Sequence, residues 1–289
     1  MINMNNSNIV ITADSTCDLP KELIDKYDIQ IIPLSVLLGE KVYRDSVDIK
    51  PSDIYDFVEK TGELPKTAAV TPSEYHEVFK RFADDGKRIV HIGFSSALSS
   101  SYQNACVAAE ELECVYCVDS KNLCTAMGLL VLKACDYREK GMDAKRIADK
   151  VTRLVPKVSA TFVLDGLEYL HKGGRCSSVA KFGANVLGIK PSIAVDTQTG
   201  RLETAKKYRG KTELVYKQYI TDRINEIKRI QPDRVVIANS GGVPADTIAF
   251  AKGMLEGRDK FEQVILADAG CTISSHCGPK TLAIFYIKK

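Results

Sequence analysis

The chain has 289 residues, enough for two domains of ordinary size, and its 45% apolar and 27% charged residues are typical of a soluble globular protein. The net charge of +3 is spread along the chain, which argues against a nucleic-acid partner. Nine cysteines without an apolar secretion signal indicate a reducing, cytoplasmic location, and no apolar run approaches the length of a membrane span.

Strand-like and helix-like segments alternate along most of the chain. This pattern predicts an α/β protein with mainly parallel sheets flanked by helices. The first strand, residues 8–12, runs into the polar cluster Asp14-Ser15-Thr16, and a helix follows over about 19–27 with Asp18 as its N-cap. Open α/β sheets place ligands at the carboxyl ends of their strands, so this cluster is either a turn or part of a binding site.

The next segments predict a strand over 30–38, a partner strand over 42–45 and a helix over 51–59. Thr71, Pro72 and Glu74 then have the spacing of a capping box with proline in the first turn, which predicts a helix to about residue 84. Thr67 lies upstream in a predicted loop, where that cap does not need its hydroxyl. The Thr67 hydroxyl is therefore free for a ligand.

A serine-rich turn follows the buried strand predicted over 88–92. It holds Ser95, Ser96 and Ser99–Ser101, and a helix is predicted over 102–112. Ser100 and Gln103 have capping-box spacing, so the helix should start near residue 99 or 100. The first amides of a helix lack intrahelical partners and lie at the positive end of its dipole, so with these hydroxyls they suit a carboxylate or a phosphate. The alternative is that the serines only cap the helix.

Cys114 and Cys117 form the Cys-x-x-Cys of this chain, within a predicted strand over 114–119. Residues three apart on a strand point to opposite faces, so we interpret them as structural thiols rather than metal ligands. Helices predicted over 123–139 and 143–154 complete a first domain, 1–157, and the second domain is 158–289.

The second domain begins with a strand over 159–164 and a short helix that stops at Gly173-Gly174, which turns Arg175 outward. Arginine is well shaped for bidentate contacts with carboxylate or phosphate. The further predictions are a helix over 178–187, a hairpin of strands 189–195 and 201–208, a helix over 211–229, a strand over 234–238, a helix over 244–255 and a strand over 263–267. His276 falls in a tight loop before the last strand, where a histidine is usually solvated.

Six polar residues in predicted loops form the candidate site: Thr67, Ser95, Ser96, Ser99, Arg175 and His276. They suit an anion at the end of the core. Motifs for nucleotide phosphates, dinucleotides, zinc proteases and serine-hydrolase elbows are missing, so we expect no cofactor and no metal. A Ser99–His276 pair with Asp14 leaves open a hydrolase or transferase that acts on a small acid, and a module for another anionic lipid also stays open.

Eight stretches along nearly the whole chain resemble, in order, the DegV family of bacterial fatty-acid-binding proteins. They are Ala13-Asp-Ser-Thr-Cys-Asp-Leu-Pro20, Ile31-Ile-Pro-Leu34, Lys66-Thr67, Ser95-Ser-Ala-Leu-Ser99 with Tyr102-Gln103, Val118-Asp-Ser120, Leu167-Glu-Tyr-Leu-His-Lys-Gly-Gly-Arg175, Gly188-Ile-Lys-Pro191 and His276-Cys-Gly-Pro279. Each stretch alone is a weak signal, and their common order makes the signal strong.

The resemblance implies two α/β domains with a long-chain fatty acid between them. Its carboxylate would meet Thr67 and Ser99, with Ser95 and Ser96 close by, and its acyl chain would run into an apolar tunnel in the second domain. Similar proteins are not enzymes themselves: they present the acid to a separate fatty acid kinase, which makes acyl-phosphate for phospholipid synthesis. Arg175 and His276 would flank that exit, and such a role allows transient membrane contact.

This sequence departs from the family pattern at three places. Ser100-Ser101 replaces Gly-Thr, Ala68-Ala-Val70 replaces Ser-Gln-Pro, and Lys280-Thr281 replaces Gly-Ala. The first change adds a Cβ near the carboxylate, and Lys280 adds a positive charge beside the exit. We expect these changes to affect which acid and which kinase are bound more than they affect the fold.

Overall fold

A parallel sheet organises the first part of the chain. The computed structural model describes residues 8–176, 188–227 and 230–289, and its first sheet has the order β2 (Ile29–Ile32), β1 (Ile9–Asp14), β6 (Arg88–Gly93) and β7 (Val115–Asp119). Its pairings are parallel, as predicted. Strands β1 and β6 are apolar runs buried along nearly their whole length, because helices cover both faces of the sheet.

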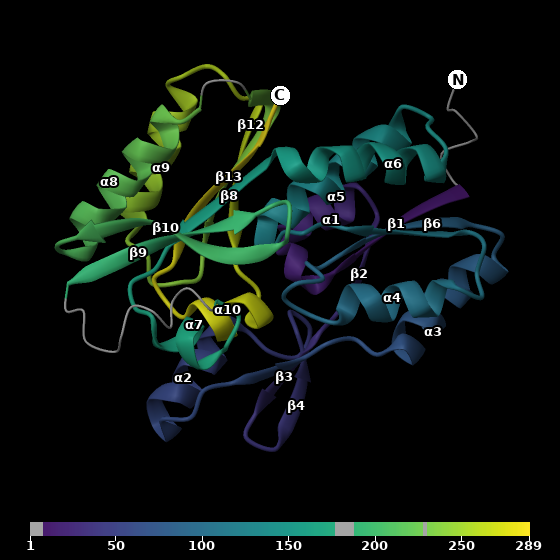
Figure 1. The fold of residues 1–289 in the computed structure, drawn as a ribbon, viewed down its shortest axis with the longest axis horizontal. Helices are drawn as coiled ribbons and strands as arrows, with labels where there is room; N and C mark the ends of the chain where they lie inside the picture. The colour runs from purple at the N-terminus through teal and green to yellow at the C-terminus, as the bar shows by residue number, and fades with distance from the viewer. Residues whose placement is uncertain (1–7, 177–187, 228–229) are drawn as a thin grey trace.

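The helices around this sheet begin largely where the sequence predicts. They are α1 (Lys21–Lys26), α3 (Pro72–Asp84), α4 (Ser101–Ala109), α5 (Cys124–Glu139) and α6 (Ala144–Leu154). Helices α3 and α4 lie together on one face, and α5 and α6 on the other (Figure 1). The capping box of Thr71 and Glu74 is confirmed at α3, and the Asp143 side chain caps α6.

Asp18 does not cap α1, so that prediction is wrong. The residue adopts the left-handed conformation, with φ 46°, after a short 3-10 turn, η2 (Ser15–Cys17), and its side chain is buried. Helix α1 begins after Pro20 instead, without a side-chain cap. The turn that joins β1 to α1 therefore takes Asp18 into the protein interior rather than to the helix amides.

The second sheet is mainly antiparallel, which corrects the prediction of two mainly parallel sheets. Its order is β10 (Arg201–Arg209), β9 (Ile189–Asp196), β8 (Val158–Val163), β13 (Leu282–Lys288), β11 (Ile230–Asn239) and β12 (Gln263–Asp268). Of its five pairings only β11 with β12 is parallel. The β9–β10 hairpin was predicted, but strand β13 inserts antiparallel between β8 and β11, and no local pattern marks that position. The α/β fold class itself is confirmed.

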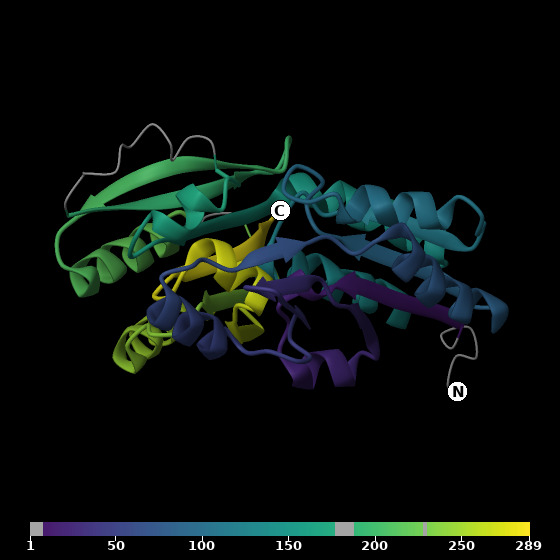
Figure 2. The ribbon, with the colours of Figure 1, turned by 90° about the horizontal axis from the view of Figure 1, so that it is seen from below.

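Helix α5 joins the two larger sheets, which lie side by side along the long axis of the molecule (Figures 1 and 2). It contacts strands β1 and β6 of the first sheet and β8, β11 and β13 of the second. Eleven of its sixteen residues are buried, and its apolar residues run all round the helix rather than along one stripe. A helix of this kind is buried on every side, so one hydrophobic core continues from the first sheet to the second.

A small antiparallel sheet lies below that junction in Figure 1. It consists of β4 (Lys41–Arg44), β3 (Ser35–Leu38) and β5 (Lys66–Ala68). The strand predicted over 30–38 is therefore two strands, because the chain leaves the first sheet at Pro33, a residue that cannot donate a ladder hydrogen bond. Thr67 lies on β5 and pairs with Val36, not in a loop as predicted.

The remaining helices are α2 (Pro51–Thr61), α7 (Glu168–Lys172), α8 (Thr212–Asn225), α9 (Ala245–Glu256) and α10 (Cys271–Cys277), with a 3-10 turn η3 (Val155–Lys157). Helices α8 and α9 cover the outer face of the second sheet (Figure 1). The helix predicted over 178–187 lies outside the described residues. The domain boundary predicted at residue 157 coincides with the end of η3, where the chain passes to the second sheet, and a division into two domains stays a prediction.

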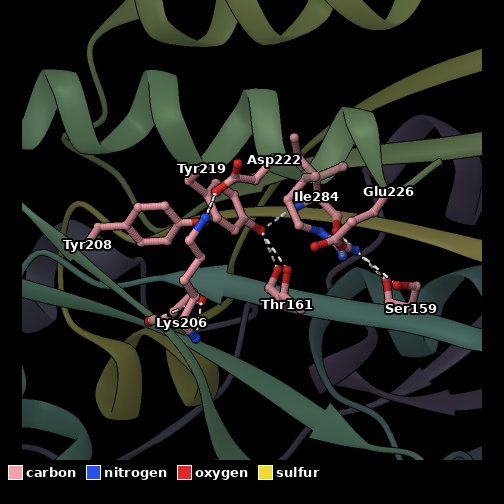
Figure 3. Close-up of polar contacts among 10 residues, drawn as sticks. Ser159, Thr161, Lys206, Tyr208, Tyr219, Asp222, Glu226 and Ile284 are labelled. Carbon is pink, nitrogen blue, oxygen red and sulfur yellow. Dashed lines mark hydrogen bonds and ion pairs between the residues drawn. The ribbon is translucent and has the colours of Figure 1, made fainter.

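Buried polar contacts fix α8 to this sheet (Figure 3). The Tyr219 hydroxyl donates to the Thr161 carbonyl oxygen at 2.6 Å and accepts from the Ile284 amide at 3.1 Å. Arg223, whose side chain is buried, donates to the Ile284 carbonyl and pairs with Glu226. These contacts hold α8 against the outer face of the sheet, although Arg223 Nε is buried there without a hydrogen-bond partner.

An ion pair at the junction provides a test of how the two sheets are held together. Arg234 on β11 makes two hydrogen bonds to Asp136 on α5, at 2.6 and 2.8 Å, with side chains 10% and 20% exposed. We expect Asp136→Ala to lower the free energy of unfolding by about 3 kcal/mol, because the buried Arg234 loses both of these hydrogen bonds and keeps only the Tyr27 hydroxyl at 3.2 Å and the more distant Asp233 carboxylate at 3.6 Å. Urea unfolding measures this, with Asp25→Ala in the exposed Lys21–Asp25 pair as a control that should change it by less than about 1 kcal/mol. Equal effects of the two changes would contradict the structural role of Arg234.

Candidate functional site

A pocket opens at the junction of the three sheets. Its volume is about 710 Å³, counting the solvent in its mouth. Six polar residues contribute to its wall: Thr67, Ser99, Ser100, Arg175, Thr272 and His276. The other lining residues are apolar: Leu34, Ala68, Ala69, Phe94, Leu98, Leu123, Phe162, Leu170, Leu202, Ile273 and Cys277. The pocket is thus an apolar cavity with a polar end.

Thr67 and His276 meet in this polar end, although 209 residues separate them in the sequence. The Thr67 Oγ1 lies 2.8 Å from His276 Nε2. His276 is not a solvated loop residue, as predicted, but part of helix α10, because the chain stays helical up to Cys277 before the Gly278 turn. Burial, and secondly the charge of Arg175, lower the pKa of His276 to about 4. The imidazole is therefore neutral at pH 7.

Ser99 also lines this pocket, just before the start of α4. Its Oγ accepts a hydrogen bond from the Ser101 amide at 3.2 Å and lies 2.9 Å from the Ser101 Oγ. The predicted capping box of Ser100 and Gln103 is not formed, because Ser100 already has helical backbone angles, and the helix starts at Ser101. Ser99 and Ser100, which directly precede the first turn of α4, both line the pocket.

Ser95 and Ser96 were also predicted at this site, but their hydroxyls bind protein groups beside it. Ser95 Oγ donates to the Gly200 carbonyl oxygen at 2.9 Å, and Ser96 Oγ donates to the Asp119 carboxylate at 2.6 Å. Neither residue is among the described residues that line the pocket. Ser95 instead ties the serine-rich turn to the β9–β10 hairpin, which positions Ser99 indirectly.

Arg175 and the double glycine before it form one side of the pocket mouth. Arg175 is exposed, and its Nη1 donates to the Gly173 carbonyl oxygen at 2.8 Å. A Cβ at position 173 would lie 2.5 Å from His276 Nδ1, so only glycine lets α7 approach the imidazole this closely. The outward direction predicted for Arg175 is confirmed, and the structure adds that Gly173 makes room for His276.

A second cavity, about 310 Å³ counting open solvent, adjoins the pocket on the side of the second sheet. The two cavities share the lining residues Leu123, Phe162, Ile273 and Cys277. The deeper walls come from α5, β8, β11, β13 and α10, and small side chains such as Ala238, Ala269 and Ala283 leave the space open. Alanines inside apolar strands look like ordinary core residues, so sequence reasoning missed them.

The hydrogen bonds of the site do not form the triad that the enzyme alternative requires. His276 Nε2 binds Thr67, Ser99 binds Ser101, and the Asp14 carboxylate binds the Tyr75 hydroxyl and the Phe94 amide. A nucleophile, a base and an orienting carboxylate must bind one another in that order. Among the described residues there is also no cluster of histidine, cysteine, aspartate or glutamate that could hold a metal ion. The arrangement can bind an acid headgroup and an apolar tail.

Comparison with known proteins shows the family of this chain. A family model described as an uncharacterised protein of the DegV family matches residues 8–289. A DegV domain-containing protein of Clostridium acetobutylicum is 32% identical over 283 residues, which are 97% of this chain and 99% of the relative. No helix in the described part of the chain is long and apolar enough to cross a membrane.

Solved structures of fatty-acid-binding proteins share the fold. A DegV family protein from Thermus thermophilus, described by its fatty acid binding, has a TM-score of 0.86 and 26% identity, covering 98% of this chain and 100% of that chain. A stearic acid-binding protein from Eubacterium ventriosum has a TM-score of 0.81 and 26% identity, covering 96% and 98%. DegV of Bacillus subtilis, a fatty acid binding protein, has a TM-score of 0.80 and 25% identity, covering 98% and 99%.

Proposed function

Since the chain belongs to the DegV family, as its eight stretches predicted, we propose that it is a non-enzymatic carrier that binds one long-chain fatty acid. The observation that carries this proposal is that Thr67 and Ser99 line the same pocket, which adjoins an apolar cavity. The carboxylate occupies the polar end, beside Thr67 and Ser99, and the acyl chain extends between α5, α10 and the second sheet.

Burial of the tail supplies most of the affinity. Each methylene group gains about 0.8 kcal/mol, so a sixteen-carbon acid gains roughly 11 kcal/mol before the cost of losing its free motion. The carboxylate then needs hydrogen bonds mainly to avoid being left unpaired, a penalty of about 1–3 kcal/mol or more. Neutral hydroxyls and helix amides meet that need without a buried counter-charge.

The Thr67–His276 contact fixes a tautomer in the complex. A carboxylate only accepts, so the Thr67 hydroxyl must donate to it, and His276 Nε2–H must donate to Thr67 Oγ1. His276 Nδ1 then carries a lone pair, which agrees with its burial without a hydrogen-bond partner. A buried N–H at that position would lack an acceptor and cost more.

The same geometry supports presentation to a kinase. Arg175 is exposed at the mouth, on the side of the neutral His276, where its guanidinium suits an incoming phosphoryl group. We propose that a separate fatty acid kinase phosphorylates the bound acid to an acyl-phosphate for phospholipid synthesis, that the protein acts in the cytoplasm, and that membrane contact is transient. A hydroxamate assay on loaded protein tests the kinase step: ATP with cell extract should give acyl hydroxamate, and ATP alone should not.

Mass spectrometry of a freshly purified, denatured sample tests the fatty acid. We expect about one long-chain acid per chain, or uptake of added palmitate or oleate by delipidated protein. If no fatty acid copurifies and the delipidated protein takes up neither palmitate nor oleate, the carrier function is contradicted. The enzyme alternative predicts instead that generic esters are turned over and that His276→Ala abolishes the turnover.

A further inference from the structure

One hydroxyl group in the wall of the pocket has no hydrogen-bond partner among the described residues. Thr272 lines the pocket from α10, its side chain is 2% exposed, and its Oγ1 is buried without a hydrogen bond. The Thr67 hydroxyl, which lines the same pocket, is by contrast paired with His276. A buried polar group without a partner lowers the stability of a protein, so the Thr272 hydroxyl requires an explanation.

The backbone of α10 does not supply the missing partner. A helical serine or threonine commonly donates to the carbonyl oxygen four residues before it, as Ser275 does to Cys271 at 2.7 Å. Thr272 is only the second residue of the helix, and the residue four positions before it, Asp268, is the end of strand β12. The start of α10 at Cys271 therefore leaves the Thr272 hydroxyl without such an acceptor.

His276 does not supply the partner either, although it lies four residues further along α10. Its Nδ1 is also buried without a hydrogen bond, so the two unpaired atoms do not bind each other. Nδ1 faces α7 instead, since a Cβ at Gly173 would lie 2.5 Å from it. Within the described part of the chain no group pairs with the Thr272 hydroxyl, and the pocket that its residue lines is the place for a partner.

Thr272 lies one helical turn from the contact between Thr67 and His276. Residues four apart on a helix share one face, with their Cβ atoms about 5–6 Å apart. Helical side chains lean toward the N-terminus of their helix, so the His276 ring leans toward Thr272 while its Nε2 contacts Thr67 Oγ1 at 2.8 Å. The unpaired hydroxyl is therefore at the end of the pocket proposed for the carboxylate.

A carboxylate is the ligand group that fits this hydroxyl. Its two oxygens have about four lone-pair sites and only accept, so it has room for a donor in addition to Thr67 and Ser99. The methylene groups of an acyl chain offer no acceptor and would leave the hydroxyl unpaired.

We propose that Thr272 is a third hydrogen-bond donor to the carboxylate of the bound fatty acid. The inference rests on the proposed function and deepens it, because it assigns a further ligand-binding residue to the same site. Thr272 differs from Thr67 in one respect: in the free protein its hydroxyl has no partner to lose.

Thr272→Val should therefore have opposite effects on the free and the loaded protein. Valine keeps the shape of threonine and lacks the hydroxyl. In delipidated protein the change removes an unpaired buried group, so the Tm should rise by about 2 °C. In loaded protein it removes a donor to the carboxylate, so the Kd for palmitate should rise by about tenfold.

Thr272→Ser is the matched variant, because it keeps the hydroxyl and loses the methyl group. Displacement of a fluorescent fatty acid measures the Kd for palmitate and dodecanoate. Thr272→Ser should stay within about fourfold of the unchanged protein, the value of one methylene group, whereas Thr272→Val should lose the same factor with both acids. Weak binding by Thr272→Ser with unchanged binding by Thr272→Val would mean that the methyl group contacts the acyl chain, and would refute the proposal.

The carboxyl resonance of bound, ¹³C-labelled palmitate tests the contact directly. A hydrogen bond to the ionised form of an acid lowers its pKa. The pKa of the bound carboxyl group should therefore be higher in Thr272→Val than in Thr272→Ser. Equal pKa values in the two variants would refute a hydrogen bond from Thr272.

Thr152→Val is the control for the loss of a helical hydroxyl. The Thr152 hydroxyl donates to the Ala148 carbonyl oxygen at 2.8 Å on α6, and Thr152 is not among the described residues that line the pocket. This variant should keep the Kd and should not raise the Tm. An unchanged Kd in Thr272→Val would overturn the inference and leave the carrier function intact. If the unchanged protein binds neither acid, the proposed function fails instead.

Discussion

Thr67→Val is expected to weaken the binding of palmitate by about ten- to a hundredfold. The change keeps the shape of the side chain and removes one donor to the carboxylate, a loss of about 1–3 kcal/mol, with each 1.4 kcal/mol worth a factor of ten. It also leaves His276 Nε2 without its partner at 2.8 Å. Displacement of a fluorescent fatty acid by palmitate measures the Kd.

In Thr67→Val the Kd should rise by the same factor for acids of different chain length, because every acid has the same carboxylate. Thr221→Val is the matched control: the Thr221 hydroxyl donates to the Lys217 carbonyl oxygen on exposed α8, away from the pocket. An unchanged Kd in Thr67→Val, or a loss that grows with chain length, would place the carboxylate somewhere else.

Local signals predicted much of this fold. The capping box at Thr71, the helix over 143–154 and the β9–β10 hairpin each depend on residues close together in the sequence, and each is confirmed. The insertion of β13 between β8 and β11 depends on partners that are distant in the sequence, because Ala283 pairs with Phe162, 121 residues away, and with Ala238, 45 residues away. The periodicity of apolar residues shows which side of a strand is buried, but not which strand lies beside it. The antiparallel pairing in the second sheet could therefore not be predicted.

The site was predicted in part for the same reason. Thr67, Ser99, Arg175 and His276 were chosen as polar residues at element ends, and the structure brings all of them to one pocket. Thr272 was missed, because a threonine inside a short helix gives no sequence signal of a binding site, and only the tertiary fold shows that it lines the pocket with His276.

A larger side chain among the small residues that line the deeper cavity is expected to have the other large effect on fatty-acid binding. Alternate residues of β13 face opposite sides: Leu282, Ile284 and Tyr286 pack in the core under α8 and α9, whereas Ala283 and Phe285 belong to the core around α5. Ala283 lines the deeper cavity and is 4% exposed. A larger side chain at this position therefore fills the space proposed for the end of the acyl chain.

Ala283→Leu is thus expected to shorten the tunnel and to change which acids bind. If about four methylene groups lose their place, at about 0.8 kcal/mol each, affinity for palmitate falls by roughly a hundredfold or more, whereas dodecanoate changes by less than about threefold. Ala249→Leu on the exposed face of α9 is the control and should alter neither affinity. Overpacking a core can cost about 1–3 kcal/mol of stability, but a merely destabilised protein would lose both acids alike. Only an obstruction in the tail channel separates them by length, and an equal loss for palmitate and dodecanoate would mean that the acyl chain lies elsewhere.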